Sequence, residues 1–326
     1  MQLDSKGCAL CCQGAKMVLF ITGRCSRSCW YCPIALERSG QDVVYANDRP
    51  IRELPEILEE AATMSALGTG ITGGEPMLVL DRVVEACRLL KGRFGSRHHI
   101  HLYTGSAPGE QELRQVQGLV DEIRMHPPEE VWACILETPY ARSARLAKSL
   151  GFDVGIEVPS LPNLSDLAPI LPLLDFLNIN ELEWGEISAD EMRRRGLEPA
   201  DGLHNAVNGA HRWAAGLRRE KKVRWCTSAF KDAVQLRERL KRIAKNTARP
   251  FERITEDGTV VYGVAELGDE PVPSRPYLKR GSFEHRDGRL ELSAKVLRRH
   301  AGDIPGNKYI IERYPNGGIV VEVIPL

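Results

Sequence analysis

The sequence predicts an α/β protein with an incomplete TIM-type (β/α) barrel of six or seven units and a small β-rich C-terminal domain. Two observations predict this fold class. From residue 17 to about residue 230, short apolar runs alternate with longer amphipathic stretches, which is typical of βα units around a parallel sheet. After Pro250 the pattern changes to two β-rich runs. A chain of 326 residues is long enough to build both parts.

Short apolar runs that end in polar residues mark the expected barrel strands. They lie at 17–23, 68–74, 99–105, 120–126, 152–159, 176–183 and, with a weaker pattern, 223–228. Amphipathic helices are expected between them at 53–67, 79–91, 139–150 and 164–175. His98 and His99 are expected at the start and on the surface of the third strand. Because polar residues follow the strands, the ligand site is expected at their carboxyl ends.

The order of these elements predicts three segments. A cysteine-containing N-terminal extension covers residues 1–16, the partial barrel covers 17–249, and the β-rich C-terminal domain covers 250–326. The barrel is expected to end in a strongly basic amphipathic helix at 231–249. The final β-rich run contains the turn signal Asn316-Gly317, which predicts a hairpin.

Composition gives no general reason to expect binding to nucleic acid, to a membrane or to an acidic partner. Lys plus Arg and Asp plus Glu both number 44, so the formal net charge is zero. No window approaches the ~18 to 20 continuous apolar residues of a membrane span. The first residues also lack the charged and then apolar pattern of a secretory signal. The sequence therefore predicts a cytoplasmic protein without a membrane partner.

Six of the nine cysteines lie in the first 32 residues, and such clustering in a reducing compartment indicates metal ligands more than disulfides. Cys25, Cys29 and Cys32 follow the first expected strand with the spacing CxxxCxxC. Thiolates are the usual ligands of iron-sulfur clusters, and three of them leave one iron of a [4Fe-4S] cube open. The alternatives are a zinc site, which normally takes four ligands, and buried structural cysteines.

A second motif, Gly73-Gly74-Glu75-Pro76, follows the second expected strand. With both motifs in this order, the sequence resembles radical S-adenosylmethionine (radical SAM) enzymes, in particular those related to the activating enzyme of pyruvate formate-lyase. The family also places an aromatic residue before the last cysteine, as Tyr31 is here. The resemblance implies an enzyme of oxidoreductase or transferase type, with a [4Fe-4S] cluster on Cys25, Cys29 and Cys32 and S-adenosylmethionine (SAM) on the fourth iron. One electron would cleave SAM to methionine and a 5′-deoxyadenosyl radical, which takes a hydrogen atom from a substrate.

The resemblance also implies which residues contact SAM. Tyr31 and the GGEP residues 73–76 are expected at the methionine end. Gly73 and Gly74 permit close approach of the backbone, and Glu75 is suited to accept a charge-assisted hydrogen bond from the methionine ammonium. The ends of later strands supply further expected SAM contacts at Thr104, Arg124, Glu157 and Asn180. The polar run 176–183 either bonds to neighbouring loops or contacts substrate or adenine.

Cys8, Cys11 and Cys12 precede the first expected strand, and Cys226 ends the last one. If the barrel nearly closes, these cysteines meet near its mouth and could hold an auxiliary iron-sulfur cluster or a structural zinc ion. The alternatives are a mobile tail with a redox-labile CxxC pair beside a buried Cys226, or a catalytic Cys226 thiol that donates hydrogen or holds substrate covalently.

The substrate is predicted less directly. The basic stretch 231–253 and the appended β-rich domain favour RNA, in particular tRNA modification, as the first hypothesis. The alternatives are modification of a protein or peptide, including glycyl-radical activation, and small-molecule biosynthesis. A non-catalytic iron-sulfur or zinc scaffold is the remaining class, and the intact GGEP motif argues against it. The radical chemistry implies an electron donor of the ferredoxin or flavodoxin type.

Overall fold

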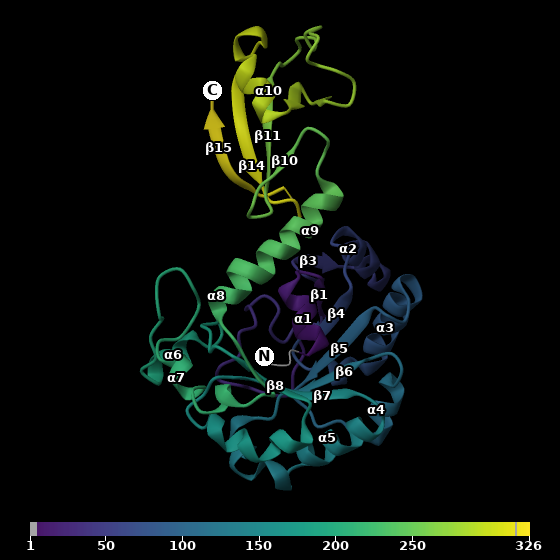
Figure 1. Cartoon of the computed structure of the whole chain (residues 1–326), viewed down its shortest axis with the longest axis vertical. Coiled ribbons are helices and arrows are strands. Elements are labelled where there is room, and N and C mark those ends of the chain that lie inside the picture. Colours follow the sequence, from purple (N-terminus) through teal and green to yellow (C-terminus); the bar gives the residue numbers. More distant parts are fainter. Residues whose placement is uncertain (1–4, 317) are drawn as a thin grey trace. The chain divides into compact units, whose positions relative to one another are not determined.

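The structure is a computed structural model that describes residues 5–316 and 318–326. It divides into two compact units, which are described separately below. The first unit comprises Met1–Ala62 and Ala66–Gln235, and the second comprises Thr63–Ser65 and Leu236–Leu326 (Figure 1). The beginning of the predicted N-terminal extension, residues 1–4, and Gly317 of the predicted turn lie outside the described residues.

The first unit is built on one sheet whose central strands are all parallel, as the βα pattern predicts. In sheet order these strands are β1 (Lys16–Phe20), β4 (Gly68–Thr72), β5 (His99–Thr104), β6 (Glu122–Met125), β7 (Asp153–Pro159), β8 (Phe176–Asn180) and β9 (Val223–Cys226). The other edge of β1 pairs with the antiparallel strand β2 (Val44–Ala46), and β3 (Arg49–Ile51) lies beyond it. The described strands therefore form an open, partial barrel, and the predicted fold class is confirmed.

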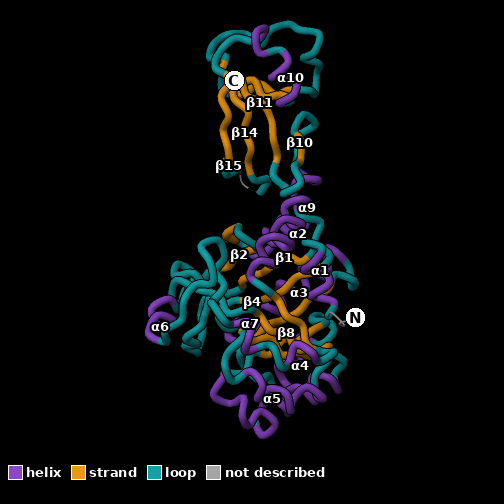
Figure 2. The backbone as a smooth tube through the Cα atoms, turned by 60° about the vertical axis from the view of Figure 1, so that its left-hand side comes forward, coloured by secondary structure: helices purple, strands orange, loops and turns teal. Residues whose placement is uncertain are grey.

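The short strands β2 and β3 were not predicted, because three-residue runs carry little periodicity. The predicted helices at 79–91 and 139–150 are confirmed as α3 (Leu80–Phe94) and α5 (Pro139–Ser149), which lie around the sheet with α4 (Glu110–Val116) (Figure 2). The helix predicted at 53–67 is shorter, with η1 (Leu54–Glu56) leading into α2 (Ile57–Thr63).

The helix predicted at 164–175 forms a 3₁₀ segment instead, η4 (Leu164–Leu173). Pro169 and Pro172 lie inside it, and proline removes the backbone donor that an α-helix needs. The remaining helical segments of this unit are short. They are α1 (Lys6–Cys12), η2 (Pro76–Val79), η3 (Glu129–Glu137), α6 (Ala189–Arg194), α7 (Ala210–Trp213), η5 (Leu217–Arg219), α8 (Ser228–Phe230) and η6 (Lys231–Leu236).

Helix α1 packs against the strands β1, β4 and β5, and Figure 1 shows it beside β1 and β4. Its approach depends on Gly7, because a Cβ atom there would lie 2.6 Å from both Arg124 Nη2 and His101 Nδ1. The Gly7 amide donates to Glu122 Oε2 at the amino end of β6, over 3.3 Å. The described part of the N-terminal extension is therefore a packed helix that closes the amino end of the barrel, and the alternative of a mobile cysteine tail does not hold for it.

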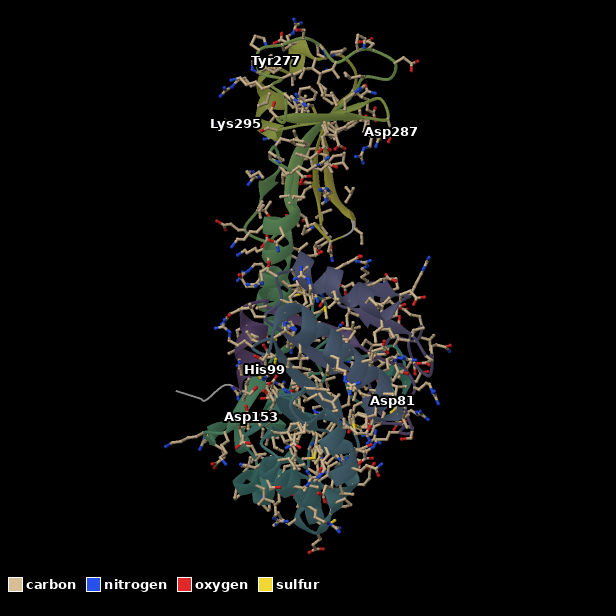
Figure 3. The ribbon with its side chains drawn as sticks, turned by 90° about the vertical axis from the view of Figure 1, so that its right-hand side faces the viewer. Asp81, His99, Asp153, Tyr277, Asp287 and Lys295 are labelled. Carbon is tan, nitrogen blue, oxygen red and sulfur yellow. The ribbon has the colours of Figure 1, made fainter. Side chains whose placement is uncertain are left out.

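The histidines at the start of β5 are buried, which corrects the expectation of a surface position for His98 and His99. Their exposed fractions are 3% and 2%, and His101 is fully buried. His98 bonds to the Thr69 hydroxyl over 2.9 Å, and His99 begins the strand (Figure 3). His98 stacks on Phe94 at the end of α3, with ring centroids 5.3 Å apart, and α1 packs against β5 beside His101, so these residues become part of the core.

The second unit is β-rich, as predicted. Helix α9 (Arg237–Thr247) precedes an antiparallel sheet, and Leu240, Ile243 and Ala244 form its buried face. The sheet order is β12 (Phe283–Arg286), β13 (Arg289–Leu292), β11 (Val260–Glu266), β14 (Lys308–Arg313) and β15 (Val320–Pro325), with β10 (Arg253–Ile254) pairing β11. The helical segments α10 (Ala294–Arg299) and η7 (Ala301–Asp303) precede β14. Contacts place α9 in this unit, whereas the sequence assigned it to the barrel.

Among the described residues, no helix combines the length and the apolar character needed to cross a membrane.

Candidate functional site

The three cysteines of the CxxxCxxC motif lie on the irregular segment that follows β1, and they share one cavity with the GGEP residues. This space, called the cysteine cavity below, has a volume of about 780 Å³. The sequence-predicted residues that line it are Cys25, Cys29, Tyr31, Cys32, Gly73, Gly74, Glu75, Pro76, Thr104, Glu157 and Asn180. All three cysteines carry free thiols. The cavity therefore brings together every expected SAM contact except Arg124, and its thiols fit a [4Fe-4S] cluster.

The two glycines of the GGEP motif are needed for backbone packing. The Gly74 amide donates to the Thr22 carbonyl oxygen over 2.7 Å, just before the cysteine segment. A Cβ atom on Gly73 would lie 2.4 Å from Thr22 O, and one on Gly74 would lie 2.3 Å from Arg24 O. Gly73 also has a φ of 155°, which side chains rarely allow. The glycines thus let the end of β4 hold the start of the cysteine segment.

Glu75 is buried and its carboxylate joins two strand ends. One oxygen accepts hydrogen bonds from the Thr104 hydroxyl over 2.7 Å and from the Met77 amide over 3.1 Å. The other accepts from the amide and the hydroxyl of Ser106 over 3.0 and 3.2 Å. Since an ionised carboxylate offers about four acceptor positions, these contacts use its capacity. A hydrogen bond from the SAM ammonium to Glu75 stays a prediction and would have to share one of them.

His126 at the end of β6 lines the cysteine cavity and was not among the expected SAM contacts. Its Nδ1 lies 2.8 Å from the Glu157 carbonyl oxygen and must carry the proton, because that oxygen can only accept. Its Nε2 therefore accepts from the Tyr31 hydroxyl, which lies 3.1 Å away. Burial lowers the pKa of His126 and raises that of Tyr31, so both groups are neutral at neutral pH. The signal in the sequence was a polar residue at a strand end, two positions after Arg124.

Arg124 lies apart from the cysteine cavity and lines a second cavity inside the barrel, called the lumen cavity below. Its guanidinium pairs with Glu122, lies 2.5 Å from Glu157 Oε2, and donates to the Tyr103 hydroxyl over 3.0 Å. Burial favours a raised pKa for Glu157, but Arg124 and hydrogen bonds from Asn178 and Asn180 outweigh it and lower the pKa to about 2. Contact between Arg124 and SAM stays a prediction, whereas Glu157 and Asn180 line both cavities.

The lumen cavity is also lined by three of the cysteines that were predicted as an auxiliary metal site, namely Cys8, Cys11 and Cys226. Cys12 lies beside them, and its sulfur accepts a hydrogen bond from Arg224 over 3.1 Å. Burial raises the pKa of Cys11, and it raises that of Cys226 to about 12, so these thiols are protonated at neutral pH. An auxiliary cluster or zinc ion on them stays a prediction.

No group of three or more His, Cys, Asp or Glu side chains in the described part of the chain converges as single-ion ligands would. This holds for Cys25, Cys29 and Cys32 and also for the cysteines that line the lumen cavity.

Basic side chains of the stretch 231–253 are largely paired. Lys231 lies 2.9 Å from Glu183, and Lys241 lies 3.1 Å from Glu238. Arg242 donates to the Met64 carbonyl oxygen over 3.0 Å, and Arg249 pairs with Glu252 over 2.8 Å. Less charge is therefore available for RNA phosphates than the sequence suggests.

Comparison with known proteins shows which protein families this chain resembles. The family model described as the radical SAM superfamily matches residues 19–127. A model described as a domain of unknown function (DUF8061) matches residues 258–326. A protein of Methanocaldococcus jannaschii, named "Putative glycyl-radical enzyme activating enzyme MJ0021", is 36% identical over 348 residues, with 98% of this chain and 92% of that protein covered.

Two solved structures of Streptococcus suis SuiB are also similar, one bound to S-adenosylmethionine and one bound to the precursor peptide SuiA. Their sequence identities are 14% and 12%, and each TM-score is 0.41. The matches cover 65% of this chain but only 50% and 48% of the SuiB chains, so this chain spans about half the length of SuiB. With both motifs on one cavity and a relative 36% identical along nearly the whole chain, this protein belongs to the radical SAM superfamily.

Proposed function

We propose that the chain holds a [4Fe-4S] cluster on Cys25, Cys29 and Cys32, seats SAM beside it, and abstracts a hydrogen atom from a glycine of a protein partner. The observation that carries the proposal is the single cavity of about 780 Å³ that these thiols share with residues 73–76. When bound, the cluster and SAM supply an electron and a 5′-deoxyadenosyl radical. The chain supplies their placement and the exclusion of water.

The residues around the cavity support each part of this placement. The end of β4 fixes the first half of the cysteine segment through Gly73 and Gly74. The Tyr31–His126 hydrogen bond ties its second half to the end of β6. Glu157 keeps its charge at neutral pH, because its pKa is near 2, and its acceptor oxygens at the cavity wall would suit hydroxyl donors such as those of a ribose.

The choice of a protein partner rests on the M. jannaschii relative, whose name describes activation of a glycyl-radical enzyme and whose length this chain nearly matches. RNA modification has weaker support, since the basic stretch that suggested it is largely paired. The reaction would draw its electron from a ferredoxin-type or flavodoxin-type donor.

The first test is SAM cleavage by the anaerobically reconstituted protein, reduced with dithionite. The wild-type protein is expected to form 5′-deoxyadenosine and methionine, and Cys29→Ala is expected to abolish both and to lower the iron content. Cys134→Ala is the matched control, because Cys134 is exposed and lies outside both cavities. Undiminished product formation by Cys29→Ala would overturn the assignment.

The second test concerns the substrate. A candidate protein partner labelled with α-deuterated glycine is expected to transfer deuterium to 5′-deoxyadenosine, as measured by mass spectrometry. The matched comparison is bulk tRNA, whose binding would have to fall steeply with salt concentration if RNA were the substrate. Salt-dependent tRNA binding without deuterium transfer from protein would favour the RNA hypothesis instead.

A further inference from the structure

The interior of this barrel is polar, although the interior of a TIM-type barrel is normally filled by branched apolar side chains. The lumen cavity has a volume of about 270 Å³. Its lining includes Lys16 from β1, Tyr103 from β5, Arg124 from β6, Glu157 from β7 and Asn178 from β8. Charged groups in such a place are costly unless they are paired, so each charge requires a partner.

Most of the charged side chains that line the lumen cavity are paired with a group of opposite charge. Arg124 pairs with both Glu122 and Glu157, and Lys231 lies 2.9 Å from Glu183. Lys16 differs. Its side chain lines the cavity and the residue is only 9% exposed, yet within the described residues no hydrogen bond or ion pair reaches its Nζ atom. The lumen thus contains a buried amine that faces open space without a counterion in contact.

The charge state of Lys16 decides what this amine can do. Burial by itself lowers the pKa of Lys16, and Arg124 repels its charge, but the pKa is raised by negative charge in the lumen, which the Glu157 carboxylate supplies at neutral pH. Lys16 is therefore an ammonium group at neutral pH. It is a donor of three hydrogen bonds rather than a nucleophile. Gly70 of the neighbouring strand β4 also lines the cavity and adds no side chain to it.

We propose that the lumen cavity binds a small molecule carrying a carboxylate or a phosphate group, whose oxygens pair with the Lys16 ammonium. A cavity of about 270 Å³, lined by residues of the strands, of α1 and of η6, has room for a small metabolite and not for a folded segment of a protein partner. The site is thus additional to the proposed function.

The lumen cavity adjoins the cysteine cavity. Thr72, Tyr103, Glu157, Asn180 and Lys231 line the lumen cavity and the cysteine cavity alike. A ligand bound at Lys16 therefore lies next to the cysteine cavity, with Cys11 and Cys226 among the residues that line its site.

The test measures the thermal unfolding midpoint by tryptophan fluorescence, without cofactor turnover, so its failure leaves the proposed function standing. The probes are inorganic phosphate and succinate at millimolar concentration and constant ionic strength, with neutral succinamide as the uncharged match for succinate. The unfolding midpoint of the wild-type protein is expected to rise to saturation with increasing concentration of at least one anion. Succinamide is expected to leave the midpoint unchanged. A rise with phosphate alone assigns a phosphate ligand, and a rise with succinate assigns a carboxylate.

Lys16→Met is expected to raise the half-saturating anion concentration roughly tenfold or more, because a charge-assisted hydrogen bond is lost. Lys16→Arg is expected to retain binding, and Lys221→Met, at an exposed position, is the matched control. The proposal fails if neither anion raises the wild-type midpoint above the sodium chloride baseline, or if Lys16→Met responds as the wild-type protein does. If Lys16→Met does not fold, Lys16→Gln, which keeps a polar side chain without the charge, is expected to weaken anion binding in the same way.

Discussion

The Thr104 hydroxyl donates a 2.7 Å hydrogen bond to the buried carboxylate of Glu75, and this bond ties the end of β5 to the GGEP segment after β4. Thr104 Oγ1 also accepts from the Ser106 amide over 2.9 Å. Thr104 and Glu75 were both predicted as SAM contacts. The hydrogen bond between them fixes part of the wall of the cysteine cavity. The bond therefore positions these two residues, and its contribution can be measured as a change in the free energy of unfolding.

Thr104→Val is expected to lower the free energy of unfolding of the first unit by about 1 to 2 kcal/mol, because Glu75 loses a donor and the Ser106 amide loses an acceptor. Glu75→Gln is expected to cost more, since its amide nitrogen would face donors. Urea unfolding followed by tryptophan fluorescence measures this unit, because every tryptophan lies in it. Equal stability of Thr104→Val and wild type would show that the bond does not hold the segment.

Gly74→Ala is expected to destabilise the first unit by roughly 1 to 3 kcal/mol and to lower the iron content after reconstitution, because its Cβ would displace the backbone at Arg24. The matched control is Gly92→Ala in α3, where a Cβ meets no atom within 4 Å among the described residues. Helix propensity predicts a gain of about 0.5 to 1 kcal/mol there. Loss of iron in both variants would contradict the packing argument.

The buried histidines predict loss of stability in mild acid. Burial, reinforced by Lys91, lowers the pKa of His98 to about 4, and burial lowers that of His99 to about 4. The unfolded chain, with histidine pKa values of about 6.5, binds these protons more tightly. The stability of the first unit is therefore complete above pH of about 6.5 and falls as the pH drops toward 4.

His99→Leu is expected to reduce the acid-induced fall in the free energy of unfolding by on the order of 3 kcal/mol. Urea unfolding at a series of pH values measures this change. His285→Leu is the control, because His285 is exposed in β12 of the second unit and should leave the tryptophan-detected slope unchanged. A slope in His99→Leu as steep as that of the wild-type protein would be evidence against the histidine origin.

Thiol alkylation should follow exposure and thiolate content. At pH 8, iodoacetamide is expected to modify the exposed Cys25 and Cys134 first in cluster-free protein. Cys87 and Cys226 should resist, because burial raises the pKa of each to about 12. Peptide mapping by mass spectrometry gives the order, and complete labelling in urea is the control. Labelling of Cys226 as fast as Cys134 would refute the protonated state of the lumen thiols.

The sequence by itself determined the seven parallel strands, because apolar runs and their polar ends are local patterns. It also determined the pairing of CxxxCxxC with GGEP, since both motifs follow adjacent strands of a parallel sheet and such ends meet at one edge. Two further expectations, the surface histidines and the helix at 164–175, were wrong. The first depended on the packing of α1 and of Phe94 in α3 against this end of the sheet, and the second on prolines whose effect on the helix was not taken into account.

Only the tertiary structure decided how the polar strand residues divide between two cavities. Arg124 and Glu157 meet because β6 and β7 are adjacent, and Arg124 also donates to the hydroxyl of Ser5, the N-cap residue of α1. Lys16 lines the same cavity, and within the described residues no counterion contacts its amine. Periodicity tells which side chains face inward, but the register between strands and the position of α1 decide which of them touch, and those depend on contacts between residues far apart in the chain.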